Sequence, residues 1–230
     1  MATRLSDALE LHADDLQKLG VFNGFVDLDS LFYVDPFLLK DVKTPELKKS
    51  YKQFKKHFSD VIKLIISSNQ KGDIFWRNAR SLLTFKEIPD ICLGYSKNNN
   101  KGNAVGSKLA DNLLNTASQI IDKGIQDPEI FELVGLLEEH FGPDRISDMT
   151  CRIIIGDLLN YTQRVTSELG LAKTIAITYK GSKYLVPKYR RPIILVPEEI
   201  LTPLPIANSW HEMEIVSQHN CTAPLLSRLV

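Results

Sequence analysis

Apolar residues recur every three or four positions along most of the chain, which is the spacing of a buried helix face. The pattern predicts helices over residues 5–19, 44–65, 73–83, 105–121, 127–141 and 149–169. Thr44 and Asp127 each precede a proline and a glutamate, residue types that favour a helix start. Three of the stripes end at a glycine, as helices commonly do (Gly20, Gly124 and Gly170).

Strand patterns are short and lie toward the two ends of the chain. Residues 21–35 are rich in aromatic and branched side chains and predict one or two short strands that end at Asp35-Pro36. Residues 174–186 predict a β-hairpin that turns near Gly181, and residues 192–197 predict a further strand. The expected fold is therefore mainly α with small β elements (α+β).

One mainly helical domain is expected over residues 1–206, with its C-terminal β elements from about residue 172. A chain of 230 residues is long enough to bury a sizeable core. Residues 207–230 carry little periodicity and are expected to form an irregular tail, which leaves open that the chain is truncated from a longer protein.

Charge and cysteine content narrow the class of protein. Lys plus Arg and Asp plus Glu both number 28, so a nucleic-acid partner would have to bind a local basic patch. Five lysines between residues 48 and 56 offer such a patch, although a solvated helix face is the simpler interpretation. The three cysteines form no Cys-x-x-Cys pair, which favours a reducing, cytoplasmic setting. No apolar run has membrane-spanning length, so no membrane partner is expected.

The densest group of polar side chains lies between two of the predicted helices. Asp144 and Asp148 are four residues apart and share a face if this stretch is helical, while Glu139 ends the preceding helix. Converging carboxylates bind hard divalent ions, so we expect these three acids to be catalytic. Asp144 and Asp148 would hold Mg²⁺ or Mn²⁺, and Arg145 would bind phosphate. The alternative is structural: Asp144 or Ser147 caps the following helix and Asp148 interacts with its dipole.

A loop rich in glycine and asparagine over residues 94–108 is the second candidate. These residue types tolerate positive φ, so the backbone N–H groups of such a loop can turn inward and bind an anion. Three lysines in it are expected to bind phosphate, namely Lys97, Lys101 and Lys108. The loop does not match the Walker A motif, because it is one residue short and Ser107 precedes Lys108. A surface loop without a ligand is the alternative.

Residues 27–29 form a D-x-D motif that resembles the haloacid dehalogenase-like phosphatases. In that family the first aspartate, here Asp27, is the nucleophile and the second, here Asp29, is the general acid. Ser68 and Asp157 resemble the hydroxyl and metal-binding positions of the same family. Both lie in segments with helical spacing, whereas that fold requires them at strand ends, so the phosphatase is kept as an alternative.

Five segments together resemble a family of uncharacterised bacterial proteins associated with mobile elements and antiphage defence. They are residues 26–36, 94–96, 127–135, 142–150 and 194–197, of which 142–150 is the most specific. The resemblance implies no established reaction. It favours a helix over residues 150–165. Members often have a lysine directly after the fifth segment, where this chain has Glu198, which puts a catalytic lysine at that position in doubt.

The leading hypothesis is a metal-dependent nuclease of a bacterial defence or mobile-element system. In it the carboxylates bind the ion, and Arg145 with the loop holds a nucleic-acid phosphate. A non-enzymatic module that binds other subunits of such a system is the first alternative, and the phosphatase is the second. If Asp144 and Asp148 share a metal, each must lie within about 5–8 Å of another acid.

Overall fold

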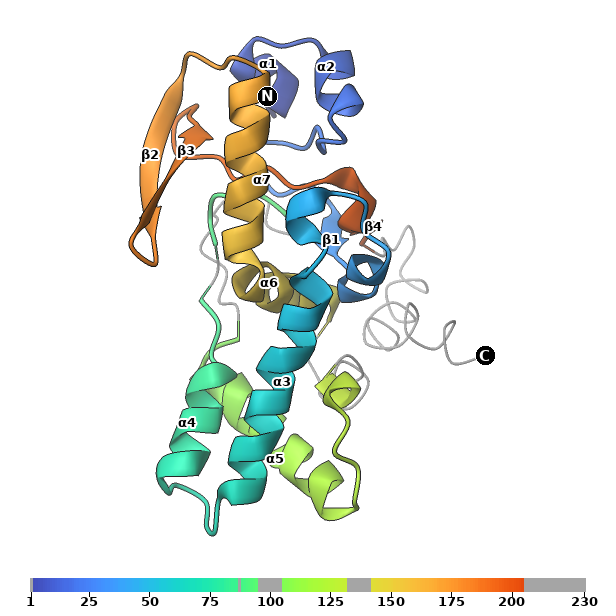
Figure 1. Cartoon of the computed structure of the whole chain (residues 1–230), viewed down its shortest axis with the longest axis vertical. Coiled ribbons are helices and arrows are strands. Elements are labelled where there is room, and N and C mark those ends of the chain that lie inside the picture. The colour runs from blue at the N-terminus through green and yellow to red at the C-terminus, as the bar shows by residue number, and fades with distance from the viewer. Residues whose placement is uncertain (1, 87, 95–104, 132–141, 205–230) are drawn as a thin grey trace.

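The fold is described by a computed structural model over residues 2–86, 88–94, 105–131 and 142–204 (Figure 1). It is mainly helical with two small antiparallel sheets, which confirms the predicted fold class. The α-helices are α1 (Leu5–Leu9), α2 (Ala13–Lys18), α3 (Ser50–Ser67), α4 (Ile74–Leu82), α5 (Ser107–Asp122), α6 (Pro143–Ile153) and α7 (Ile155–Glu168). The shorter helices are η1 (Pro36–Lys40), η2 (Pro45–Leu47), η3 (Pro128–Phe131) and η5 (Glu198–Ile200), and the strands are β1 (Phe32–Val34), β2 (Thr174–Tyr179), β3 (Ser182–Pro187) and β4 (Leu201–Pro203).

Two hydrophobic clusters form the interior of the part of the chain that the structure describes. The first joins α1, α2, β1 and α7 to the buried residues 193–196 and Ile200, and the second joins α3, α4, α5 and η3. Helix α6 contributes to both, since Ile146 and Met149 belong to the second cluster and Cys151 belongs to the first. In Figure 1, α6 accordingly lies across the middle of the molecule, between α7 above and α3 below.

Strand pairing confirms the hairpin and corrects the last predicted strand. β2 and β3 pair from Thr174↔Pro187 to Tyr179↔Ser182, so the hairpin turns at residues 180–181. Residues 193–196 form no strand; β4 pairs with β1 instead. The reason is that this segment bonds to several different elements. Ile194 N donates to Asp90 O (2.9 Å) and Leu195 N donates to Thr162 Oγ1 (3.0 Å).

Helices α4 and α5 match their predictions, whereas other helices break or begin elsewhere. The predicted helix over 5–19 is two helices, because Glu10 adopts a left-handed conformation (φ 59°) that ends α1. The predicted start at Thr44 yields only η2, and α3 begins at Ser50. The predicted helix over 127–141 begins as η3, and its remainder lies outside the described residues.

The predicted helix over 149–169 is split into α6 and α7 at Ile154, and α6 begins earlier, at Pro143. The break lets α6 bury Met149 in one cluster while α7 buries Leu158 in the other. Residues 144–148 are therefore helical, as the shared face of Asp144 and Asp148 requires. None of the helices in the described parts of the chain is long and apolar enough to cross a membrane.

Candidate functional site

Three segments that are distant in sequence meet at the start of α6. The loop before β1 is bonded to residues 92–94, because Ser30 N donates to Cys92 O and Gly94 N donates to Ser30 O (both 3.0 Å). β1 is bonded to α6, because Val34 N donates to Ser147 Oγ (2.9 Å) in the buried interior. These bonds hold parts of three of the segments that carry the family resemblance in one fixed arrangement.

Gly94 lies against two carboxylates. A Cβ atom built on Gly94 would lie 2.5 Å from Oδ1 of Asp144 and 3.3 Å from Oδ2 of Asp29. The two oxygens are therefore separated by no more than the sum of these distances, which places Asp144 within the range expected for acids that share a metal. Only glycine leaves room for both carboxylates here, and its φ of +131° is one that other residues rarely adopt.

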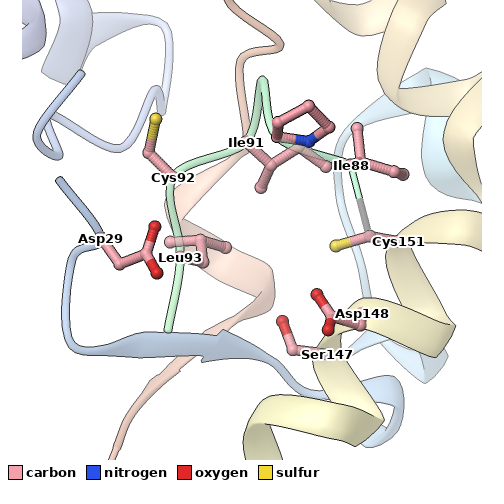
Figure 2. Close-up of a pocket in the computed structure, with 9 residues that line it drawn as sticks. Asp29, Ile88, Ile91, Cys92, Leu93, Ser147, Asp148 and Cys151 are labelled. Atoms are coloured by element: carbon pink, nitrogen blue, oxygen red, sulfur yellow. The ribbon is translucent and has the colours of Figure 1, made fainter. Parts of the chain in front are cut away.

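Asp148 lies one helical turn after Asp144 and lines a small pocket together with Asp29. Figure 2 shows the two carboxylates entering this pocket from opposite sides, Asp29 from the loop before β1 and Asp148 from α6. The free volume of the pocket is about 10 Å³, enough for one water-sized group. A single ion or water fits between these acids, but a nucleotide does not.

The electrostatics of Asp144 distinguish it from a capping residue. Burial raises the pKa of the Asp144 carboxyl, and the positive charge of Arg145 opposes that rise. The N-cap of α6 is Gly142, which makes no side-chain cap hydrogen bond. The expectation that Asp144 or Ser147 caps this helix is therefore wrong, since Asp144 lies within the first turn and Ser147 accepts its bond from β1.

The carboxylates can supply some, but not all, of the ligands of a metal ion. Among the residues that the structure describes, no group of three His, Cys, Asp or Glu side chains is arranged to hold a metal by itself. Mg²⁺ commonly binds through one or two carboxylates and keeps several waters, which substrate phosphate can replace. The Asp29–Asp144 pair, with Asp148 beside it, meets that smaller requirement.

The other predicted site residues are only partly accounted for. Glu139, Lys97 and Lys101 lie outside the described residues. Lys108 lies in the first turn of α5 and does not line the carboxylate pocket. Helix α5 is joined to α4, because the guanidinium of Arg80 donates to Asp111. Arg145 is half-buried next to Asp144.

Asp29 is the member of this site that sequence reasoning assigned to a different chemistry. It was interpreted through the D-x-D motif, as the partner of Asp27. The carboxylate of Asp27 instead accepts hydrogen bonds from Thr3, and these lower the pKa of Asp27. The signal in the sequence was that Asp29, Gly94 and Asp144 each lie in a segment that carries the resemblance.

The phosphatase-like residues do not gather around a sheet. Ser68 ends α3 and donates to Asp73 Oδ1 (3.1 Å). Asp157 lies in the first turn of α7 and accepts from Ser50 Oγ (2.6 Å). Asp157 is helical, as its spacing predicted, whereas Ser68 is the extended C-cap that follows α3. The sheets within the described ranges are two-stranded and antiparallel.

Comparison with known proteins gives one match. The model of a family described as a domain of unknown function (DUF8370) matches residues 10–208. No curated protein and no solved structure matches the chain. Because the family match spans most of the 230 residues, the chain belongs to the DUF8370 family.

Proposed function

We propose that the chain binds a divalent cation, Mg²⁺ or Mn²⁺, at the Asp29–Asp144 pair, with Asp148 beside it, and uses it to hydrolyse phosphodiester bonds of nucleic acid. The observation that carries the proposal is the approach of Asp29 and Asp144 to each other across Gly94. A cation at this point would neutralise both carboxylates, activate a water molecule and orient a phosphate group.

The energetic argument is that this arrangement is unfavourable for the apo fold. Carboxylates that share a partly buried position repel each other and lose hydration, and both effects disfavour their charged forms. Burial outweighs the opposing positive charge of Arg145, so the pKa of Asp144 is raised, and no side-chain cap hydrogen bond is made at the start of α6. Perturbed carboxylates of this kind are characteristic of sites that bind ions or substrates.

The test measures Mn²⁺ binding and cleavage separately. Asp29→Asn, Asp144→Asn and Asp148→Asn keep the side-chain shape and remove a negative charge, and each should weaken Mn²⁺ binding about tenfold or more in calorimetry. Asp14→Asn is the matched control, because Asp14 lies exposed in the first turn of α2. Labelled DNA and RNA should be cut with Mg²⁺ or Mn²⁺ and not with EDTA, and Asp144→Ala/Asp148→Ala should lose this activity. Equal Mn²⁺ affinity in all variants would contradict the site.

A non-enzymatic interaction module is the second candidate, favoured by one surface. Ile66, Ile74 and Phe75 are 50%, 55% and 40% exposed where α3 gives way to α4. Exposed apolar groups in this number at one end of a helix pair are typical of a surface that binds another protein. This function remains if the carboxylate variants change neither Mn²⁺ binding nor cleavage. The association with antiphage defence or mobile elements stays a prediction, as does the cytoplasmic setting.

A further inference from the structure

A second, larger hollow lies at the other end of α6. Four elements form its walls: the middle of α3, the end of α4, the last turn of α6 and the turn of the β2–β3 hairpin. Its volume is about 450 Å³, far larger than the carboxylate pocket. We call it the hairpin groove, and its polar and aromatic lining includes Gln53, Lys56, His57, Arg152, Tyr179 and Lys180.

The groove carries a net positive charge. Within the described residues, Arg152 and Lys180 have no acidic side chain at ion-pair distance, whereas Lys56 pairs with Asp60. Lys180 Nζ lies 5.3 Å from the centre of the Tyr179 ring, so a cation and an aromatic side chain are presented together. Two cations without acidic partners at a concave surface attract an anion, because the surrounding protein limits screening by solvent.

His57 contributes to the wall of the groove but not to its charge. Its Nε2 lies 3.0 Å from the backbone oxygen of Leu82, which joins α3 to the end of α4. Burial lowers the pKa of His57, although the bond to Leu82 and the charge of Asp60 oppose this. The positive charge therefore comes from arginine and lysine, which keep it at neutral pH.

Helix α6 connects the groove to the carboxylates. Asp144, Asp148 and Arg152 are spaced four residues apart, so they follow one another along one side of the helix, about 6 Å apart along its axis. Figure 1 shows the lower end of the β2–β3 hairpin and α4 on the same side of the molecule, with α6 toward the middle. An extended anion in the groove would therefore reach the carboxylates through neighbouring phosphates.

We propose that the hairpin groove binds the phosphodiester backbone of a single-stranded nucleic acid, with Arg152 and Lys180 on successive phosphates and the scissile phosphate toward Asp148. This inference rests on the proposed nuclease function and names the form of its substrate. A groove that combines cations with an aromatic side chain suits a single strand, whose bases are free to stack while its backbone follows the charges.

Binding is tested in EDTA, so that neither metal nor cleavage affects the result. A short fluorescein-labelled DNA or RNA strand is titrated with the protein while fluorescence anisotropy is recorded at several salt concentrations. Arg152→Gln/Lys180→Gln should raise the Kd about tenfold or more and reduce the slope of log K against log salt by about 1.4, since each phosphate contact on a single strand contributes about 0.7. Arg77→Gln/Lys123→Gln removes the same charge at exposed positions outside the groove and should bind like the wild type.

The outcomes separate this inference from the proposed function. Asp144→Asn should bind the strand at least as tightly as the wild type, because it leaves the groove intact and removes a negative charge. If the groove variant binds like the wild type, if no strand binds at all, or if a duplex binds more tightly than the single strand, the groove proposal is wrong. If the groove variant weakens binding but the wild type cuts nothing with Mg²⁺ or Mn²⁺, the groove stands and the nuclease function fails.

Discussion

The starts of α4 and α6 combine the same two features, an aspartate and a glycine at positive φ, but use them differently. At α4, Asp73 is the N-cap, and its carboxylate accepts hydrogen bonds from Trp76 N (2.8 Å) and Asn69 N (2.9 Å). These bonds lower the pKa of Asp73. Gly72, at φ +89°, has open space where a Cβ would be.

At α6, the aspartate lies inside the first turn and the glycine comes from a distant segment. Burial raises the pKa of Asp144, and Gly94 fits against its carboxylate with no room for a Cβ. When hydrogen bonds stabilise the charged form of an acid, its role is structural. When burial disfavours the charged form and a second acid lies close by, the acid is a candidate for binding a cation. The comparison therefore separates a structural aspartate from a candidate for metal binding within a single chain.

The largest expected effect comes from the two glycines. Gly72→Ala should lower the free energy of unfolding by about 1 kcal/mol, because alanine is strained at positive φ. Gly94→Ala should cost about 3 kcal/mol, because it adds a collision with Asp144 to the same strain. Urea denaturation measures both. In an Asp144→Ala background, Gly94→Ala should cost less unfolding free energy than in the wild type, because the collision with Asp144 is gone. Equal costs for Gly72→Ala and Gly94→Ala in the wild type would contradict the close approach at Gly94.

The two aspartates provide the next effect. Asp73→Ala removes a cap and should lower the Tm by about 3 °C. Asp144→Ala should leave the Tm unchanged or raise it at neutral pH without metal, because it removes a destabilised carboxylate. Thermal unfolding should also show that Mn²⁺ raises the Tm of the wild type but not that of Asp144→Ala. A fall in Tm for Asp144→Ala as large as that for Asp73→Ala would restore a structural role for Asp144.

The contrast between these helix starts also shows which features can be predicted from local sequence and which cannot. Helices α4 and α5 and the β2–β3 hairpin were predicted because their spacing and turn residues are local. The break at Ile154 was missed because two separate clusters, not the stripe itself, decide where the helix turns. The Asp144–Asp148 face was predicted from their spacing, but the approach of Asp29 depends on a loop more than one hundred residues away.

The smallest expected effect is the pH dependence, in which the two acids should act in opposite directions. The folded-state pKa of Asp73 is lowered, so its contribution to stability is present above the unfolded value and is lost as the pH falls through the folded value. The folded-state pKa of Asp144 is raised, so its contribution is present below the unfolded value and is lost as the pH rises through the folded value.

Asp73→Asn and Asp144→Asn test this directly, because asparagine keeps the side-chain shape, can still cap α4 and does not titrate in this range. Between about pH 3 and about pH 7, the Tm of the wild type minus that of Asp73→Asn should rise with pH. The Tm of the wild type minus that of Asp144→Asn should fall over the same range. The measurement is made without metal, since a bound cation would stabilise the charged form of Asp144 and reverse its sign. If both differences rise with pH, Asp144 is stabilised in its charged form like a cap, and the distinction between the two helix starts is lost.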